Sequence, residues 1–149
     1  MSNIPNFFKV SESVATGAQP PVEGLQELKE AGYTAVLNLS PRSTPNYLPQ
    51  EAEIVESQGM DYVHYPVDCS HLKKNHYTMF SKIMQGFSDA RVFIHCGGNI
   101  KSSNLMHMYN VLESDMDEKD SYNELLKVQT PEEKWIRYFR DFGMKGLPA

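Results

Sequence analysis

Residues 92–103 have the sequence VFIHCGGNIKSS, in which an apolar stretch runs into a cysteine and a pair of glycines. The run Val92–His95 is short and apolar, which is typical of a buried strand. Gly97 and Gly98 allow the backbone to turn sharply, and a helical segment follows from about residue 101 to residue 113. The segment therefore predicts a strand, a tight loop and a helix, in that order.

A loop between a strand and the start of a helix is suited to binding anions. Its backbone N–H groups can face one point, and the helix N-terminus adds positive potential. Lys101 adds a full positive charge, and Ser102 and Ser103 offer hydroxyl donors. The same field stabilises a thiolate, which makes Cys96 a candidate nucleophile. The alternative is an inert buried thiol at a strand end, but so many suitable residues in one loop favour a functional site.

Apolar strands alternate with helical segments along most of the chain. Strands are expected near residues 7–10, 15–20, 34–39, 62–67 and 91–95, and helices near residues 22–31, 51–58, 77–87 and 101–113. This alternation predicts an α/β fold with a mostly parallel central sheet flanked by helices. We expect a single domain over residues 1–149, with a core of about 7–112 and C-terminal helices over about 114–145.

Composition excludes several classes of function. Fourteen basic and nineteen acidic residues give a net charge of −5, which argues against a nucleic-acid partner. No apolar run approaches the roughly 20 residues of a membrane span. Residues 1–9 lack a signal-peptide pattern, which favours the cytoplasm by default, or the periplasm if a leader has been removed. His64 and His107 lack metal-ligand spacing, so neither a metal nor a cofactor is expected.

The motif HCGGNIKS of residues 95–102 resembles the phosphate-binding loop of cysteine-dependent phosphatases. Three other stretches extend the likeness: residues 17–20 (GAQP), 32–39 (GYTAVLNL) and 59–68 (GMDYVHYPVD). Together they resemble the β-lactamase-hydrolase-like protein phosphatase family, a bacterial branch related to dual-specificity phosphatases. The resemblance implies a protein-tyrosine-phosphatase-like fold over roughly residues 7–112.

The same resemblance implies a two-step hydrolysis of phosphate monoesters. The Cys96 thiolate would attack phosphorus, and water would then hydrolyse the phosphocysteine. The phosphate-binding residues would be Gly97, Gly98, Asn99, Ile100, Lys101, Ser102 and Ser103. The expected partner is a phosphorylated small molecule or a phosphoprotein, and a phosphate or sulfate ion would occupy the loop.

Asp68 is the candidate general acid, because it follows a predicted strand at the position where related phosphatases carry their acid. Its alternative role is that of a turn or N-cap residue ahead of Ser70. Cys69, next to it, is either a small buried residue or the partner of Cys96 in a reversible disulfide.

The loop departs from the family pattern at two positions. Lys101 stands where the family carries arginine, and it offers a point charge in place of a planar fork. Asn99 replaces a glycine, which matters less because asparagine tolerates a left-handed backbone. Two alternatives to a working phosphatase follow. One is a catalytically weak relative that binds phosphate or a phosphoprotein. The other, less favoured, is a rhodanese-like sulfurtransferase, which shares the five-residue offset from Cys96 to Lys101.

Overall fold

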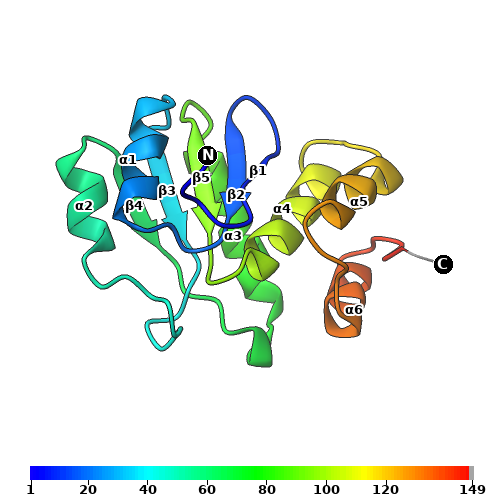
Figure 1. Ribbon diagram of the computed structural model, residues 1–149. Helices are drawn as coiled ribbons and strands as arrows, with labels where there is room; N and C mark the ends of the chain where they lie inside the picture. The colour runs from blue at the N-terminus through cyan, green and yellow to red at the C-terminus, as the bar shows by residue number, and fades with distance from the viewer. Residues whose placement is uncertain (148–149) are drawn as a thin grey trace. The chain divides into compact units, whose positions relative to one another are not determined.

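The central sheet has five strands in the computed structural model, which describes residues 1–147. Their order across the sheet is β1-β2-β5-β3-β4 (Figure 1). The strands are β1 (Phe8–Lys9), β2 (Val14–Gly17), β3 (Ala35–Asn38), β4 (Asp61–His64) and β5 (Val92–His95). Only the pairing of β1 with β2 is antiparallel, and the other three strand pairs are parallel. The predicted α/β fold with a mostly parallel sheet is confirmed.

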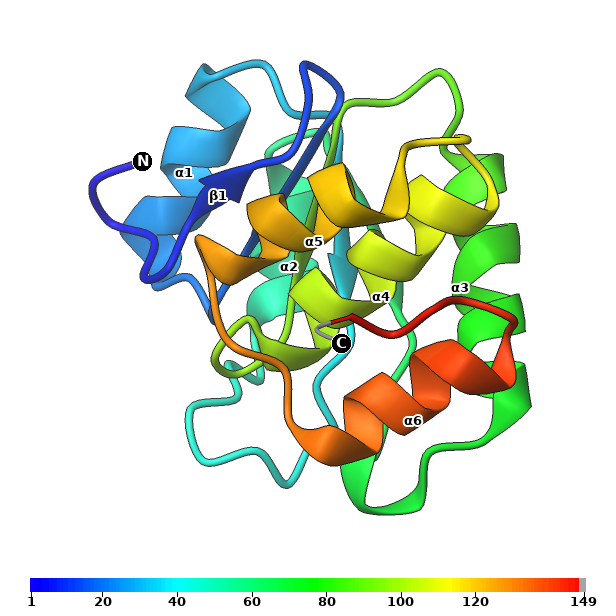
Figure 2. The same ribbon diagram turned by 90° about the vertical axis from the view of Figure 1, so that its right-hand side faces the viewer.

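Helices connect the parallel strands, as crossover connections require. They are α1 (Val22–Glu30), α2 (Glu51–Ser57), the short 3-10 helix η1 (Cys69–His71), α3 (Lys74–Gly86), α4 (Ile100–Leu112), α5 (Glu118–Leu126) and α6 (Glu133–Asp141). Helices α1 and α2 lie on one face of the sheet and α3 lies on the other, as Figures 1 and 2 show. None of the helices in the described residues is long and apolar enough to cross a membrane.

The bounds of the elements differ from the sequence prediction by one to three residues, and two of these differences have a clear physical reason. Strand β4 stops at His64, ahead of Pro66, because proline has no N–H to offer to a neighbouring strand. Helix α3 starts at Lys74, three residues before the predicted start. The ring of His76 accepts a hydrogen bond from the Lys73 N–H at 3.0 Å, and this cap makes the earlier start possible.

Strand β5 lies at the centre of the sheet and carries the candidate loop at its end. All four of its residues are buried, between β2 on one side and β3 on the other. Gly17 of β2 packs so closely against this strand that a Cβ atom there would lie 2.8 Å from the Phe93 ring. The position therefore requires glycine, and the carboxyl ends of β2 and β5 are held close together.

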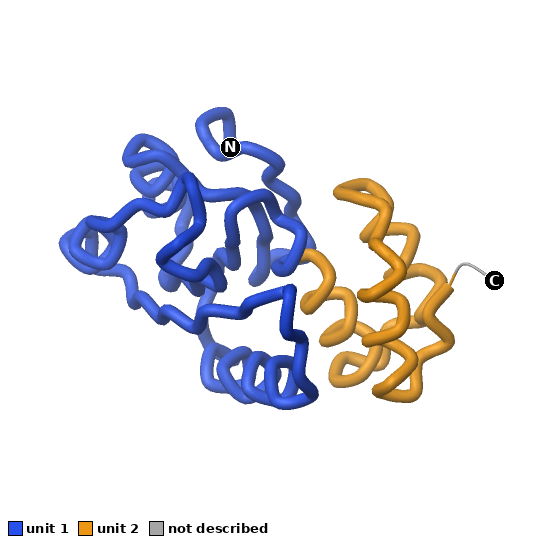
Figure 3. Tube along the Cα trace, turned by 90° about the horizontal axis from the view of Figure 1, so that it is seen from below, with its two compact units in different colours: residues 1–102 blue, residues 103–149 orange. Residues whose placement is uncertain are grey.

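The chain divides into two compact units (Figure 3). The first, Met1–Ser102, contains the whole sheet and the candidate loop. The second starts at Ser103 and contains most of α4 together with α5 and α6. Its core includes Trp135 and Phe139, both fully buried. The boundary between the two units falls within α4.

Candidate functional site

Cys96 is the first residue after β5 and is almost fully buried, with 1% of its surface exposed. The carboxyl ends of β2, β3 and β5 meet at this edge of the sheet, because these strands run parallel. Ligands of open α/β sheets bind outside the carboxyl ends of the strands. The candidate nucleophile therefore lies where this fold type places its ligands.

Three successive carbonyl groups of the loop are held by donors that lie outside it. The Cys96 oxygen faces His95 Nδ1 at 3.3 Å. The Gly97 oxygen accepts from the Gln19 N–H at 3.3 Å and from Asn46 Nδ2 at 3.0 Å. The Gly98 oxygen accepts from Asn6 Nδ2 at 3.1 Å. A trans peptide directs its C=O and N–H to opposite sides, so the Gly97 and Gly98 N–H groups point away from these donors. This arrangement leaves a side of the loop that presents N–H groups.

Asn99 adopts the left-handed conformation that the loop needs, with φ of +69°. Its side-chain amide donates to the carbonyl of Asn6 at 3.0 Å and to Thr16 Oγ1 at 3.1 Å. The family's glycine would reach the same φ without these bonds. Asparagine therefore satisfies the backbone requirement and also ties the loop to β2.

Helix α4 begins at Ile100, directly after the loop. Lys101, its second residue, is partly exposed, so its charge lies in the first turn. Ser102 is fully buried, and its hydroxyl has no hydrogen-bond partner among residues 1–147. The Ser103 hydroxyl accepts a hydrogen bond from Gln129 Nε2 at 2.6 Å, within the second compact unit. Of the two serines, Ser102 is the one with an unused donor.

Asp68 caps the short helix η1 in this structure. Its carboxylate accepts from the Ser70 N–H at 2.9 Å and lies 3.2 Å from His71 Nδ1. These hydrogen bonds, first that from the Ser70 backbone, lower the pKa of the exposed Asp68 carboxyl. The arrangement is the one expected of an N-cap residue, and it disfavours the protonated state that a general acid needs. Its neighbour Cys69 is half-buried, and both it and Cys96 are free thiols.

A buried acid–histidine pair adjoins the loop, and sequence reasoning missed it. Glu51, the first residue of α2, forms a hydrogen bond through Oε2 to His95 Nε2. Its other oxygen accepts from Gln19 Nε2 at 2.7 Å. An acid in the first turn of a helix is ordinarily explained by the helix dipole, so nothing in the sequence marks Glu51 as buried.

The segment after β3, residues 40–49, packs against the loop through Thr44 and Asn46. His64 Nε2 is 2.6 Å from the Ser40 carbonyl, which anchors the start of this segment to β4. A Cβ atom at Gly97 would lie 2.9 Å from a methyl carbon of Thr44. Gly97 is therefore required for the close approach of the two segments, as well as for the turn.

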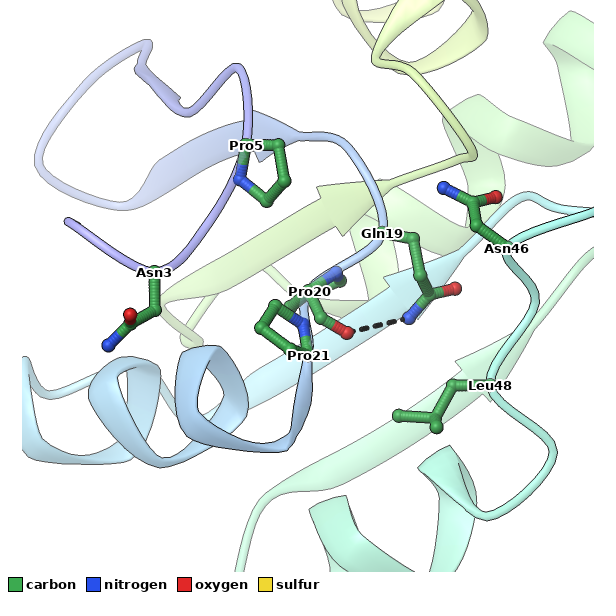
Figure 4. A pocket seen from close by; sticks show the side chains of 7 residues that line it. All are labelled: Asn3, Pro5, Gln19, Pro20, Pro21, Asn46 and Leu48. Atoms are coloured by element: carbon green, nitrogen blue, oxygen red, sulfur yellow. Dashed lines mark hydrogen bonds between the residues drawn. The ribbon is translucent and has the colours of Figure 1, made fainter.

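A pocket of about 370 Å³ lies beside the residues that hold the loop carbonyls (Figure 4). This side of the loop is its carbonyl side. Its lining is uncharged, with four apolar and three amide side chains: Pro5, Pro20, Pro21, Leu48, Asn3, Gln19 and Asn46. Gln19 and Asn46 are the residues that hold the Gly97 carbonyl. An uncharged pocket on the carbonyl side offers a phosphate little attraction. The opposite side of the loop, which presents N–H groups, is the better anion site.

Metal ligands do not gather anywhere in the described chain. Within residues 1–147, no three side chains of the histidine, cysteine, aspartate and glutamate types lie close enough to hold an ion. The chemistry available at the loop is that of Cys96, the backbone N–H groups, Lys101 and Ser102.

Solved structures with the same fold include several phosphatases. A DUF442 protein of Shewanella putrefaciens CN-32, described as a "putative phosphatase", superposes with a TM-score of 0.83 at 23% identity, over 94% of this chain and 92% of that one. P. aeruginosa TpbA, crystallised with pTyr, superposes with a TM-score of 0.75 at 14% identity, over 95% of this chain and 85% of that chain. A kinase associated phosphatase with its catalytic cysteine changed to serine superposes with a TM-score of 0.75 at 15% identity, over 87% of this chain and 84% of that chain.

These similarities establish the fold of the chain as protein-tyrosine-phosphatase-like, in agreement with the resemblance drawn from its sequence. They extend over 87% to 95% of the chain. Neither a family profile nor a curated protein sequence matches it.

Proposed function

We propose that this chain is a cysteine-dependent phosphatase that hydrolyses phosphate monoesters through a phosphocysteine. The observation that carries the proposal is that donors outside the loop hold the carbonyls of residues 96–98. The Gly97 and Gly98 N–H groups therefore point to the other side of the loop. Backbone N–H groups beside a helix start suit the oxygens of a phosphoryl group. Cys96 lies at the base of that loop.

The reaction has two steps. Cys96 Sγ forms a bond to phosphorus while the bond from phosphorus to the leaving oxygen breaks, and the alcohol departs with a proton from a general acid. Water then attacks the phosphocysteine, which releases inorganic phosphate and restores the thiolate. Lys101 and the loop N–H groups stabilise the negative charge of the transferring group, and Ser102 supplies a further donor. Asp68 is the candidate acid.

A catalytically weak phosphate-binding protein is the second candidate function. Two observations favour it. Lys101 cannot form the two parallel hydrogen bonds that arginine gives to phosphate. The hydrogen bonds of Asp68 also keep its carboxyl ionised, which would slow protonation of the leaving group. In this function the loop would bind phosphate or a phosphorylated partner with little turnover.

Hydrolysis of para-nitrophenyl phosphate by the wild type and Cys96→Ser, between pH 5 and pH 8, separates the two functions. A phosphatase should show turnover that falls by at least about a thousandfold in Cys96→Ser. Cys69→Ser is the matched control, because it removes the other thiol and should retain activity. Thermal stabilisation by phosphate in every variant, without turnover in the wild type, would contradict the phosphatase and support the binding protein.

A further inference from the structure

The segment of residues 1–6 precedes the sheet and has no part in the proposed displacement, yet it contacts the candidate loop twice. Asn6 Nδ2 donates a hydrogen bond to the Gly98 carbonyl at 3.1 Å. The carbonyl of Asn6 accepts in turn from Asn99 Nδ2 at 3.0 Å. The two bonds join residues that are 92 and 93 positions apart in the chain. A segment outside the expected core therefore bonds to the end of the phosphate-binding loop.

This segment is anchored to helix α1 ahead of its contacts with the loop. Ile4 is 4% exposed and belongs to the main cluster of buried apolar residues. Its side chain packs on Gly24 of α1, where a Cβ atom would lie 2.9 Å from it. The Glu27 carboxylate of the same helix accepts from the Asn3 N–H at 2.8 Å and from the Ser2 hydroxyl at 3.1 Å. Residues 2–4 therefore fix the position from which Asn6 reaches the loop.

Asn6 combines a left-handed backbone with an amide donor. Its φ is +52°, a conformation that asparagine tolerates better than most residues. Three residues other than glycine have a positive φ within residues 1–147, and two of them, Asn6 and Asn99, are joined by a hydrogen bond. Glycine would allow the same backbone but would bring no donor to the Gly98 carbonyl. The residue type at position 6 therefore serves the backbone and the loop together.

The bond from Asn6 orients the last peptide of the loop before α4. A trans peptide directs its C=O and N–H to opposite sides, so holding the Gly98 carbonyl sets the direction of the Asn99 N–H. Packing does little to hold Gly98, because a Cβ atom there would have no neighbour within 4 Å. Gly98 also pairs with Ala18, whose own N–H donates to the Pro5 carbonyl at 3.0 Å. Both restraints on Gly98 therefore involve the segment of residues 1–6.

We propose that Asn6 is a positioning residue that holds the peptide between Gly98 and Asn99 in the conformation that binds phosphate. The segment is the fixed partner in this contact, because Ile4 and Glu27 anchor it to α1 without the loop. The inference rests on the proposed function for what the loop binds. Its first test measures the motion of the loop itself, so it needs neither a ligand nor turnover of a phosphate ester.

The first test compares the wild type with Asn6→Gly by nitrogen-15 NMR relaxation. Glycine keeps the positive φ and the main-chain carbonyl that accepts from Asn99, so only the side-chain donor is lost. We expect the amide order parameters of Gly98 and Asn99 to fall from about 0.85 to about 0.6, while those of Val92–His95 stay unchanged. The matched control is Asn3→Gly, the same substitution in the same segment, which leaves the main-chain bond to α1 in place.

The second test measures the affinity for inorganic phosphate by isothermal titration calorimetry. The dissociation constant should rise by about fivefold in Asn6→Gly, as expected for the loss of one hydrogen bond, and should stay unchanged in Asn3→Gly. Equal mobility of the loop in Asn6→Gly and the wild type would overturn the proposal. A mobile loop with unchanged phosphate affinity, or a fall in order parameters that includes Val92–His95, would indicate a merely structural role and would also overturn it.

These results are separate from those that test the proposed function. Both expected results in a chain that does not hydrolyse para-nitrophenyl phosphate would support the inference and contradict only the proposed turnover. A wild type that hydrolyses the ester, with loop mobility and phosphate affinity unchanged in Asn6→Gly, would support the proposed function and overturn only the inference. A wild type that does not bind phosphate would overturn both.

Discussion

The side-chain amide of Asn99 donates to Thr16 Oγ1 at 3.1 Å, which joins the candidate loop to the strand next to it. The bond connects residues that are 83 positions apart in the chain. It lies at the one position of the loop where a residue other than glycine has a positive φ. The conformation of the loop therefore depends on a contact with β2 as well as on its own glycines.

Substitutions of Asn99 should separate the conformation from the contact. Asn99→Gly keeps access to φ of +69° but loses the bonds to Asn6 and Thr16, so we expect a loss of about 1 kcal/mol in the free energy of unfolding. Asn99→Ala adds the strain of a left-handed alanine, of about another 1 kcal/mol. Urea denaturation of the wild type, Asn99→Gly and Asn99→Ala measures both losses of unfolding free energy. Equal stabilities of the glycine and alanine variants would contradict the role of φ.

Two replacements of Lys101 should have opposite effects, because one strengthens the contact with phosphate and the other removes its charge. Lys101→Arg introduces a planar fork that can hold two phosphate oxygens, so kcat/KM for para-nitrophenyl phosphate should rise by about tenfold or more. Lys101→Met keeps the length of the side chain and removes the charge, so phosphate should stabilise that variant less in a thermal shift experiment. The role assigned to Lys101 is wrong if the methionine variant binds phosphate as well as the wild type.

The pH profile should reveal whether Asp68 is the general acid. The Ser70 N–H and His71 lower the pKa of this carboxyl, so its protonated fraction falls as the pH rises from 5 to 7. With phenyl phosphate, whose leaving group needs a proton, kcat should fall over the same range. In Asp68→Asn, which can still cap η1, the profile should be flatter and the rate at pH 5 lower.

The leaving group supplies the control for this prediction. Para-nitrophenolate departs with little help from a proton, so Asp68→Asn should affect its release much less than that of phenol. Equal effects of the substitution on the two esters would exclude Asp68 as the acid and leave it the role of an N-cap.

His107 should make the second compact unit sensitive to acid. Burial lowers its pKa from 6.5 to about 4, while Nδ1 lies 2.7 Å from Ser121 Oγ and the ring lies edge-on to Phe139. Because the folded pKa is below the unfolded one, the unfolded chain binds the extra proton first as the pH falls. Stability is then complete above about pH 7 and is lost between about pH 6.5 and pH 4, by an amount on the order of 3 kcal/mol.

Denaturation of the wild type and His107→Gln at several pH values measures this loss. Glutamine can still bond to Ser121 but does not titrate, so the variant should lose less stability between pH 7 and pH 4.5. Identical losses in the two proteins would show that other groups determine the acid sensitivity.

Local patterns in the sequence were sufficient for the strand, loop and helix of residues 92–112. Strand propensity, glycines and helical periodicity act over a few neighbouring residues, so they can be recognised without the fold. The same holds for the clustering of Cys96, Lys101 and Ser102, which are adjacent in the chain. The left-handed backbone at Asn99 also agrees with the tolerance of asparagine for that conformation.

Only the tertiary structure determined what surrounds the loop. His95 meets Glu51, 44 residues away, and Gly97 meets Asn46, 51 residues away. These contacts depend on the strand order, which places β5 between β2 and β3, and on how the helices after those strands return to the sheet. Parallel strands joined by crossovers bring distant segments together at their carboxyl ends, and no local pattern specifies which ones meet. The contacts that surround the loop are therefore a property of the fold, whereas the cysteine and its loop are properties of the sequence.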